Sequence, residues 1–522
     1  MSEADLILTG ARVRTLDPAR PLAGAVAIRD GLIAAVGDPA DAREWRGPAT
    51  ETVDLAGATL TPGWTDAHSH PVWGLELATG TDLSHVTTLE ELRAALRAAE
   101  RTGGWILGHG LDHNAFGGRP LHHRLIADAA AGAPVCLRLY DGHSALVSET
   151  ALKLAGITGP REFAQRASVV CDAEGRPTGH LIEHAAMDLL TPVLPALPRA
   201  ERGARLAGLL TAMAATGLTG AHVMDLAGDA PALLAAFERE RDLPLRLRLA
   251  PWCMPGASPA DLDELIALQG VSGRDWRIGG VKFFMDGTVE GGTAWLDRPD
   301  CHGQGREAFW PDPDAYGAAV RRLHTAGVPT ATHAIGDAAV RHVLDTAAAL
   351  GPAGPRHRVE HIETVPDDQL GRFAALGVAA SMQPPHAEYT REDHTDEWSR
   401  RLGGERASRA WRCRDLRDAG AVLALGSDWP IAHFDARRIL ATARTPRGAA
   451  SGTGLTGLMA LEGLTSHAAL AAGEEPIAGR IAPGFRADLT AVDLDPVTTP
   501  ADEIAETPVR LTVVAGRVVF RA

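Results

Sequence analysis

The sequence predicts an α/β fold, a (β/α)8 TIM-like barrel with a small β-sandwich built from both termini and an insertion after the first barrel strand. Strand-like and helical segments alternate through the middle of the 522-residue chain, which is typical of parallel sheets. Both ends are instead rich in short strands and tight turns. The gap between the first two barrel strands is too long for one connecting helix and therefore predicts an insertion.

The two ends of the chain, residues 1–57 and 480–522, are predicted to form one composite β-sandwich. Both contain short apolar segments between turns, and Asp30-Gly31 is a strong hairpin signal. The predicted strands are 6–10, 25–31, 32–37, 487–493 and 509–520. A unit of this kind requires the two ends of the chain to lie together.

Residues 58–75 and 201–479 are predicted to form the barrel. About eight strands close such a barrel, and the candidates are 66–68, 220–225, 245–251, 281–286, 331–333, 359–361, 380–383 and 423–428. Amphipathic stretches between them predict helices at 315–326, 338–350, 367–376 and 406–419. Because active sites of this fold lie at the carboxyl ends of the strands, polar residues there are the candidates for chemistry.

Residues 76–200 are predicted to be an insertion, or lid subdomain. They contain strand-like runs at 105–109 and 135–140 and a polar hairpin candidate at 169–180. The insertion directly follows the first barrel strand, so we expect it to bear on the choice of substrate.

The composition argues against nucleic acid and membrane as partners. The formal net charge is −15 and no basic block is present. Hydrophobic residues make up 45% of the chain, mean hydropathy is −0.05, and no apolar run approaches the ~20 residues of a spanning helix. Five cysteines without C-x-x-C spacing, together with a start that lacks a secretory signal, predict a soluble cytoplasmic protein.

Two histidines, His68 and His70, end the first predicted barrel strand. Residues i and i+2 of a strand point to the same side, so both imidazoles can aim at one point past the strand end. Two convergent imidazoles are the beginning of a metal site, although an isolated H-x-H is more often a pair of hydrogen-bonded loop residues. The other strand ends must decide between these two interpretations.

Three further strand ends carry residues of the metal-ligand type, namely His333, His361 and Asp428. Each of them alone is explained by ordinary core or loop packing. Four histidines and a carboxylate at one end of one barrel are difficult to explain without a metal. The set therefore predicts a metal centre.

Lysine is rare in this chain, since Lys153 and Lys282 are the two lysines and arginine supplies the other positive charges. Lys282 lies in an apolar strand, where an unpaired ammonium is costly. It could pair with Asp286, lose its proton and act as a base or nucleophile, or react with CO2 to form a carbamate. The nearby histidines favour the carbamate, because it supplies the anionic bridge that two divalent metals need and arginine cannot form it.

These residues resemble the amidohydrolase superfamily, in particular the amidohydrolase family 3 branch of N-substituted formamide deformylase-like metal-dependent hydrolases. The resemblance covers nearly the whole chain. The motifs that carry it are Pro62-Gly63-x-x-Asp66-x-His68-x-His70, Asp141-Gly-His143-Ser144, Gly280-Val-Lys282, His333-Ala-Ile-Gly336-Asp337, Gln383-Pro-Pro-His386, Gly426-Ser-Asp428-Trp-Pro430 and Gly484-Phe-Arg-Ala-Asp488-Leu.

The resemblance implies a site for one or two divalent metal ions. The implied ligands are His68, His70 and Asp428 for the more buried ion, His333 and His361 for the more exposed one, and carboxylated Lys282 as the bridge. Zinc is the expected metal, and manganese, iron or cobalt would also suit these ligands. Asp428 and Lys282 are the implied catalytic residues, with Asp428 passing a proton from the attacking water to the leaving nitrogen.

The implied activity is hydrolysis of a non-peptide C–N bond, in an amide, N-formyl or N-acyl group of a small molecule, by a metal-activated hydroxide. Candidate substrate-binding residues are Asp112, His113, Asp141, His143, Asp286, Gln383, His386 and Trp429. The alternatives are an isomerase, decarboxylase or imine hydrolase of the same fold, or a non-catalytic scaffold, which the presence of all six candidate ligands disfavours. No dinucleotide or phosphate-loop motif implies an organic cofactor. A homodimer is expected by analogy with the family.

Overall fold

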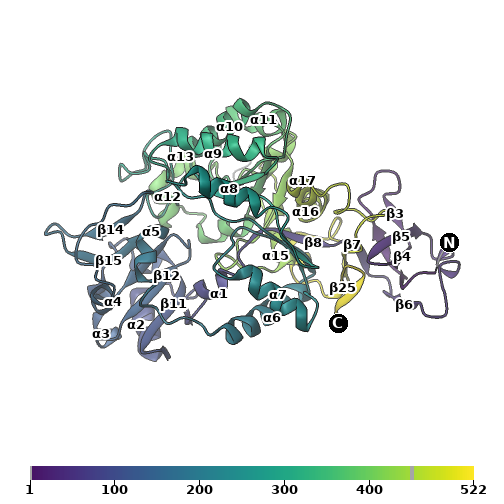
Figure 1. The fold of residues 1–522 in the computed structure, drawn as a ribbon, viewed down its shortest axis with the longest axis horizontal. Helices are drawn as coiled ribbons and strands as arrows, with labels where there is room; N and C mark the ends of the chain where they lie inside the picture. Colours follow the sequence, from purple (N-terminus) through teal and green to yellow (C-terminus); the bar gives the residue numbers. More distant parts are fainter. Residues whose placement is uncertain (1–2, 447–451) are drawn as a thin grey trace.

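The computed structural model describes residues 3–446 and 452–522 and has a mixed α/β fold. In Figure 1 a central body of strands and helices lies between the N-terminal sheets at one end and the predicted insertion at the other. Residues 1–2 and 447–451, which fall within the predicted terminal and barrel domains, lie outside the described residues.

The central body contains two parallel sheets, ordered β18–β17–β16–β8 and β19–β20–β21–β22–β23. Their strands are β8 (Trp64–Ser69), β16 (Leu218–Val223), β17 (Arg246–Leu249), β18 (Trp276–Ile278), β19 (Val281–Phe284), β20 (Thr330–Ala334), β21 (Arg358–His361), β22 (Ala379–Met382) and β23 (Leu423–Leu425). All eight predicted barrel strands overlap members of this set. Every pairing within the two sheets is parallel.

Backbone hydrogen bonds join the two sheets on both sides. After β17, the Pro251 carbonyl accepts from Lys282 N in β19 at 2.9 Å. On the other side, the His68 carbonyl in β8 accepts from Asp428 N at 2.7 Å. This arrangement of parallel strands is a TIM-barrel-like α/β fold, and it brings β8 and the segment after β23 side by side.

Helices are interspersed with these strands or follow them along the chain, and all but the last contribute to one large hydrophobic core. They are α6 (Arg199–Ala215), α7 (Ala230–Glu240), α8 (Pro259–Ala267), α9 (Pro313–Thr325), α10 (Asp337–Leu350), α11 (Asp367–Leu376), α15 (Ala436–Arg444), α16 (Gly457–Leu464) and α17 (Ser466–Ala472). The last helix packs on alanines of β8, β22 and β23. The predicted helices at 315–326, 338–350 and 367–376 correspond to α9, α10 and α11. Ser258 and Asp312, each followed by proline, cap α8 and α9.

The prediction of a single helix at 406–419 is wrong. The chain there holds the end of α13 (Gly404–Ala407) and α14 (Cys413–Asp418), with a break between them. A further short helix, α12 (Glu397–Leu402), precedes α13. Trp411, at the break, has a φ of 48° and its backbone N donates to the Glu363 carbonyl at 3.0 Å. Its buried indole stacks on Trp398 with ring centroids 4.4 Å apart. Tertiary packing of this indole therefore overrides the local helical pattern.

Strands from both ends of the chain form two sheets, ordered β5–β4–β1–β6 and β26–β25–β24–β7–β2–β3. Their bounds are β1 (Leu6–Thr9), β2 (Arg12–Arg14), β3 (Leu22–Ala23), β4 (Ala25–Arg29), β5 (Leu32–Gly37), β6 (Glu51–Asp54), β7 (Thr59–Pro62), β24 (Leu489–Val492), β25 (Val509–Val514) and β26 (Arg517–Arg521). One hydrophobic cluster includes Leu8 and Leu60 from the first end and Leu511 from the second. The two ends therefore share a core, and β7 belongs to it although the predicted domain boundary precedes it.

The predicted insertion contains one mixed sheet, ordered β10–β11–β12–β13–β15–β14, with β9 paired to β11. Its elements are β9 (Thr81–Asp82), α2 (Leu89–Ala98), β10 (Arg101–Thr102), β11 (Trp105–Leu111), α3 (Ala127–Ala130), β12 (Val135–Leu139), β13 (Ser144–Val147), α4 (Glu149–Leu154), β14 (Ser168–Cys171), β15 (Pro177–Ile182) and α5 (His184–Met187). The predicted strands at 105–109 and 135–140 and the hairpin at 169–180 match β11, β12 and β14–β15. The domain limits themselves stay a prediction.

Two short helices complete the fold, α1 (Gly74–Leu77) and α18 (Ala501–Ala505). Among the described residues, none of the helices is both long and apolar enough to cross a membrane.

Candidate metal centre

The six predicted ligands lie together at the carboxyl ends of the central strands. They line one small cavity of about 20 Å³: His68, His70, Lys282, His333, His361 and Asp428. All six side chains are buried. Residues up to 360 positions apart in sequence therefore meet at the end of the sheet where this type of fold places its chemistry.

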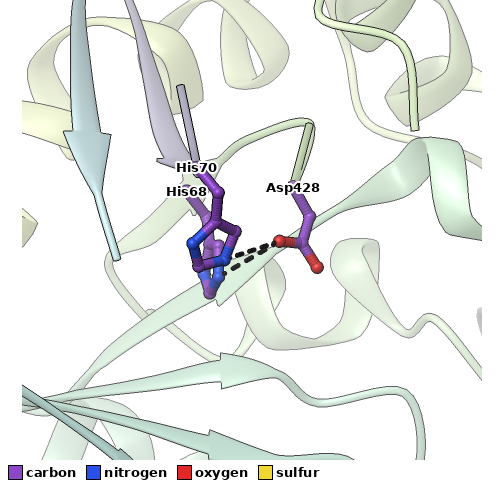
Figure 2. A group of neighbouring side chains, drawn as sticks. All are labelled: His68, His70 and Asp428. Carbon is purple, nitrogen blue, oxygen red and sulfur yellow. Dashed lines mark ion pairs between the residues drawn. The ribbon is translucent and has the colours of Figure 1, made fainter. Parts of the chain in front are cut away.

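Two histidines and one aspartate form the first possible metal-binding group. The Nε2 atoms of His68 and His70 lie 3.4 and 3.2 Å from Asp428 Oδ1. Figure 2 shows both imidazoles directed at this carboxylate. A metal ion could replace these contacts, because all three side chains offer ligand atoms to the same small volume.

Both imidazoles are oriented by a second carboxylate. His68 Nδ1 donates to Glu360 at 2.6 Å, and His70 Nδ1 donates to Asp225 at 2.8 Å. Each contact fixes the proton on Nδ1 and turns Nε2 toward Asp428. This arrangement of carboxylate, histidine and ligand atom is the support that metal-bound histidines usually have.

The two imidazoles differ in their electrostatic surroundings. Burial and the neighbouring ammonium of Lys282 lower the pKa of His68 to about 4. Burial also opposes the charge on His70, but hydrogen bonds to Asp225 and Asp428 outweigh it and raise its pKa to about 9. A metal ion bound at His70 Nε2 would displace a proton from this nitrogen.

Backbone geometry brings the strand ends to the site. Asp66 Oδ1 accepts from His68 N at 3.1 Å and from Ser427 N at 2.9 Å, which joins β8 to the loop after β23. Asp428 itself has a φ of 60° and His361 a φ of 73°. Such left-handed conformations are costly for residues other than glycine, and they commonly occur where side chains must be aimed into a site.

Lys282 points into the same cluster and does not pair with Asp286, one of the predicted alternatives. Its Nζ lies 3.3 Å from His68 Nε2, and burial lowers its pKa to about 8. Asp286 instead accepts backbone N–H groups of Trp295, Ile335 and Gly336 at 2.7–2.9 Å. A lowered pKa makes the neutral amine, the form that reacts with CO2, more accessible.

His386, predicted as a substrate contact, belongs to a second possible metal-binding group with His361 and Asp428. Its Nε2 lies 3.4 Å from Asp428 Oδ2, and its ring stacks on His361 with centroids 5.8 Å apart. His333, predicted as a ligand of the exposed ion, donates Nε2–H to the Gly287 carbonyl at 3.1 Å. Its ring is also 4.4 Å from that of His361, centroid to centroid.

The donor set suits a divalent metal. His361 Nδ1 and His386 Nε2 are buried nitrogens without a hydrogen-bond partner among the described residues. Burial lowers the pKa of His361 well below its usual value, so its imidazole is neutral. Burial alone would raise the pKa of Asp428, but His68 and His70 hold it below its usual range. Imidazoles and a carboxylate together are the ligands of zinc and related metals.

The insertion supplies one wall of the site. Asp141 and His143, from the loop between β12 and β13, line a neighbouring cavity of about 30 Å³ together with His361 and Asp428. His143 Nδ1 donates to Glu183 at 2.7 Å, and Asp141 accepts from His113 Nε2 at 2.9 Å. Contacts from His113 and His143 outweigh burial and lower the pKa of Asp141 to about 2, so it is a carboxylate.

The remaining predicted substrate residues lie behind this first layer. Asp112 is half-buried and accepts from Asn114 N, Gln383 is buried, and Trp429 packs near Phe434 with ring centroids 6.4 Å apart. His113 contacts the site through Asp141. Asp286 Oδ1 lies 3.6 Å from Nε2 of the candidate ligand His333. Direct contact of these residues with substrate stays a prediction.

Sequence reasoning missed several residues that support or line the site. Glu360 and Asp225 orient the two histidines, and both stand at predicted strand ends, where their carboxylates could have been noticed. Glu290, which accepts from the Tyr140 hydroxyl, and His184 line the two cavities. Neither lies in a pattern that distinguishes it from an ordinary loop residue.

Comparisons with known proteins agree with this geometry. The model of the amidohydrolase family matches residues 51–520. The chain is 31% identical to protein LONG AFTER FAR-RED 3 of Arabidopsis thaliana over 84% of this chain and 78% of that protein. It is 27% identical to N-substituted formamide deformylase of Arthrobacter pascens over 98% of this chain and 97% of that enzyme.

A solved structure is similar over almost the whole chain. An uncharacterized metal-dependent hydrolase from Pyrococcus horikoshii superimposes with a TM-score of 0.73 and 25% sequence identity. The match covers 95% of this chain and 99% of that structure.

Proposed function

Since the chain belongs to the amidohydrolase family, a family of metal-dependent hydrolases, we propose that it cleaves a non-peptide C–N bond in a small-molecule amide. The observation that carries the proposal is the pair of carboxylate-oriented imidazoles facing Asp428, with the amine of Lys282 beside them. N-formyl and N-acyl amides are the proposed substrates, as the resemblance to a formamide deformylase suggests.

The proposed metal ligands are His68, His70 and Asp428 for one ion, with His361 and either His386 or His333 for a second. Zinc is the proposed metal. Once bound, the metal lowers the pKa of a water molecule and polarises the substrate carbonyl. Lys282, as a carbamate, would place two oxygens between the two ligand groups.

Asp428 is the proposed proton carrier. Its two carboxylate oxygens face different groups, Oδ1 toward His70 at 3.2 Å and Oδ2 toward His386 at 3.4 Å. A carboxylate in this position can accept a proton from the attacking water and deliver it to the leaving nitrogen. Removal of the carboxylate would therefore affect the chemical step as well as metal binding.

The cavity beside Asp428 favours substrates without negative charge. Its lining includes Asp141, Glu290 and Glu363, and the residues that line it include no lysine or arginine. Burial raises the pKa of Glu290 well above its usual value, whereas Asp141 is charged. A free carboxylate on the substrate would lie close to Asp141 with no lysine or arginine to pair with. The one lining imidazole with a raised pKa, His143, already pairs with Glu183. We therefore place neutral or cationic amides ahead of N-acyl amino acids.

Substrate entry requires the insertion to move. The cavity of about 30 Å³ corresponds to roughly one water molecule. Tyr140, which precedes Asp141, stacks on Tyr389 beside the central strands with ring centroids 3.8 Å apart. Separation of these two rings would widen the cavity, and we propose that the insertion serves as the lid.

The test is turnover by metal-loaded protein on a matched panel: N-formyl amines, neutral N-acyl amines, N-acyl amino acids and cyclic amides. We expect release of amine and acid from the first two groups, with weaker or no turnover of the amino acid derivatives. Products of unchanged mass, loss of CO2 or hydrolysis of imines alone would support an isomerase, a decarboxylase or an imine hydrolase instead. If the protein retains no metal after incubation with zinc and converts none of these substrates, the proposal is refuted.

A further inference from the structure

A larger cavity, of about 230 Å³, lies at the opposite end of the central strands from the metal centre. It is lined by early residues of four parallel strands, including Thr65 of β8, Thr219 of β16, Arg246 of β17 and Trp276 of β18. The metal centre lies at the other ends of such strands. The proposed hydrolysis does not use this larger cavity.

Among the described residues, Arg248 is the cation of this cavity that has no ion-pair partner. Its side chain is only 9% exposed, and its Nε has no hydrogen-bond partner among the described residues. The neighbouring arginines are paired: Arg246 contacts Asp275 and Asp488 at 3.1 and 2.7 Å. The Arg277 and Arg486 guanidiniums both contact Glu474. Arg248 is therefore left to face the cavity alone.

The chain makes room for this guanidinium at Gly279. A Cβ at Gly279 would lie 3.1 Å from Arg248 Nε and 3.4 Å from its Cζ. Gly280, next in sequence, has a φ of +98°, and a Cβ there would lie 3.7 Å from Arg248 Nη1. Two consecutive glycines thus allow the backbone to pass directly beside the buried charge.

The charges that line this cavity do not balance. Unpaired buried donors are costly, and an unpaired buried cation is more so. The lining holds five arginines against three carboxylates, and the contacts above already engage all three carboxylates. A ligand that pairs with Arg248 must supply acceptor atoms and negative charge.

We propose that this cavity is a binding site for a small oxyanion, a carboxylate or a phosphate, with Arg248 as its principal contact. The planar guanidinium offers parallel N–H groups that match the two oxygens of either group. A volume of about 230 Å³ corresponds to roughly eight water molecules, enough for such an anion with some residual water. The site is separate from the catalytic centre, so the proposal does not rest on the proposed activity.

The test measures thermal unfolding and calorimetric binding of metal-loaded protein with inorganic phosphate, acetate or chloride at equal ionic strength. We expect a saturable rise in Tm with phosphate or acetate that exceeds the chloride effect, and the better of the two identifies the ligand class. In Arg248→Met the affinity for that anion should fall at least about tenfold, because the charged contact is removed. The exposed Arg20→Met variant should retain the wild-type affinity and serves as the matched control.

A second variant distinguishes loss of anion binding from a folding defect in Arg248→Met. Gly279→Ala keeps the charge but adds a methyl group against Arg248, and we expect it to weaken anion binding while the protein remains folded. Equal anion affinity in wild type and Arg248→Met would mean that the anion binds elsewhere, for example at the metal, and would overturn the proposal. So would the absence of any oxyanion effect beyond that of chloride, which would make this a water-filled cavity.

Discussion

Replacement of Asp225 provides a direct test of how the metal centre is held. Asp225 makes a 2.8 Å hydrogen bond to His70 Nδ1 and a 3.3 Å contact from Ala227 N. Asp225→Ala removes both contacts and frees the imidazole to rotate or change tautomer. Asp225→Asn keeps an acceptor for both donors but removes the charge.

The expected magnitude follows from the chemistry of the bond. A hydrogen bond to a charged group contributes about 1.5–3 kcal/mol, and loss of such a supporting carboxylate typically weakens metal binding by about 10- to 100-fold. We therefore expect Asp225→Ala to raise the metal dissociation constant about 10- to 100-fold, and Asp225→Asn to have a smaller effect. The exposed Asp128→Ala variant, which removes a carboxylate from α3, should bind metal like the wild type.

The assay is competition of each variant with a calibrated chelator for zinc at constant pH, followed by the metal content of the dialysed protein. Circular dichroism and Tm, measured in parallel, separate loss of metal affinity from loss of fold. An Asp225→Ala protein that is folded and binds zinc within about threefold of the wild type would refute the view that His70 is a ligand oriented by this carboxylate.

Three further predictions concern the amine, the second ligand group and the fold. Lys282→Arg keeps a cation that cannot form a carbamate. We expect kcat/KM to fall by more than ~100-fold, the decrease that loss of a residue supporting a metal ligand typically causes. The ¹³C-carbamate signal of the wild type under ¹³CO2 should disappear in the variant. His386→Ala should lower the bound metal by about one ion per chain if this residue is a ligand, whereas a pure substrate contact would change KM at constant metal content. His357 accepts from the backbone N and hydroxyl of Thr330, and burial lowers its pKa to about 4. Because an unfolded histidine titrates near pH 6.5, the free energy of unfolding should fall by up to about 3 kcal/mol as the pH drops from 6.5 to 4, and urea titrations should show a flatter profile for His357→Gln.

The positions of the candidate ligands were predictable because parallel strands restrict them. His68, His333 and His361 stand at the ends of apolar segments, and such ends meet at one edge of a barrel. Asp428 could be placed by the same argument. The strands themselves were predictable from short apolar runs separated by helices of suitable length.

The contacts behind the ligands were not predictable from the sequence. Whether a carboxylate such as Glu360 or Asp225 faces an imidazole depends on the stagger between strands that are distant in sequence, which no local pattern encodes. His386 follows two prolines in a turn after β22, and only the tertiary fold shows that its ring stacks on His361. The break before α14 also depends on tertiary contacts, because the Trp411 indole stacks on Trp398 and its backbone is not helical.

A buried ion pair explains how strand register and ligand orientation are linked. Arg358, at the start of β21, contacts Glu360 and also donates to the Ala67 carbonyl at 2.6 Å and to the Ser381 hydroxyl at 2.7 Å. One guanidinium thus connects β8, β21 and β22 to the carboxylate that holds His68. A buried pair of this kind contributes little to stability compared with apolar packing, but removing one partner leaves the other charge unpaired, which costs about 3–5 kcal/mol. A shift of any of these strands would break the same contacts that aim His68 Nε2, so the correct fold and the correct ligand geometry form together.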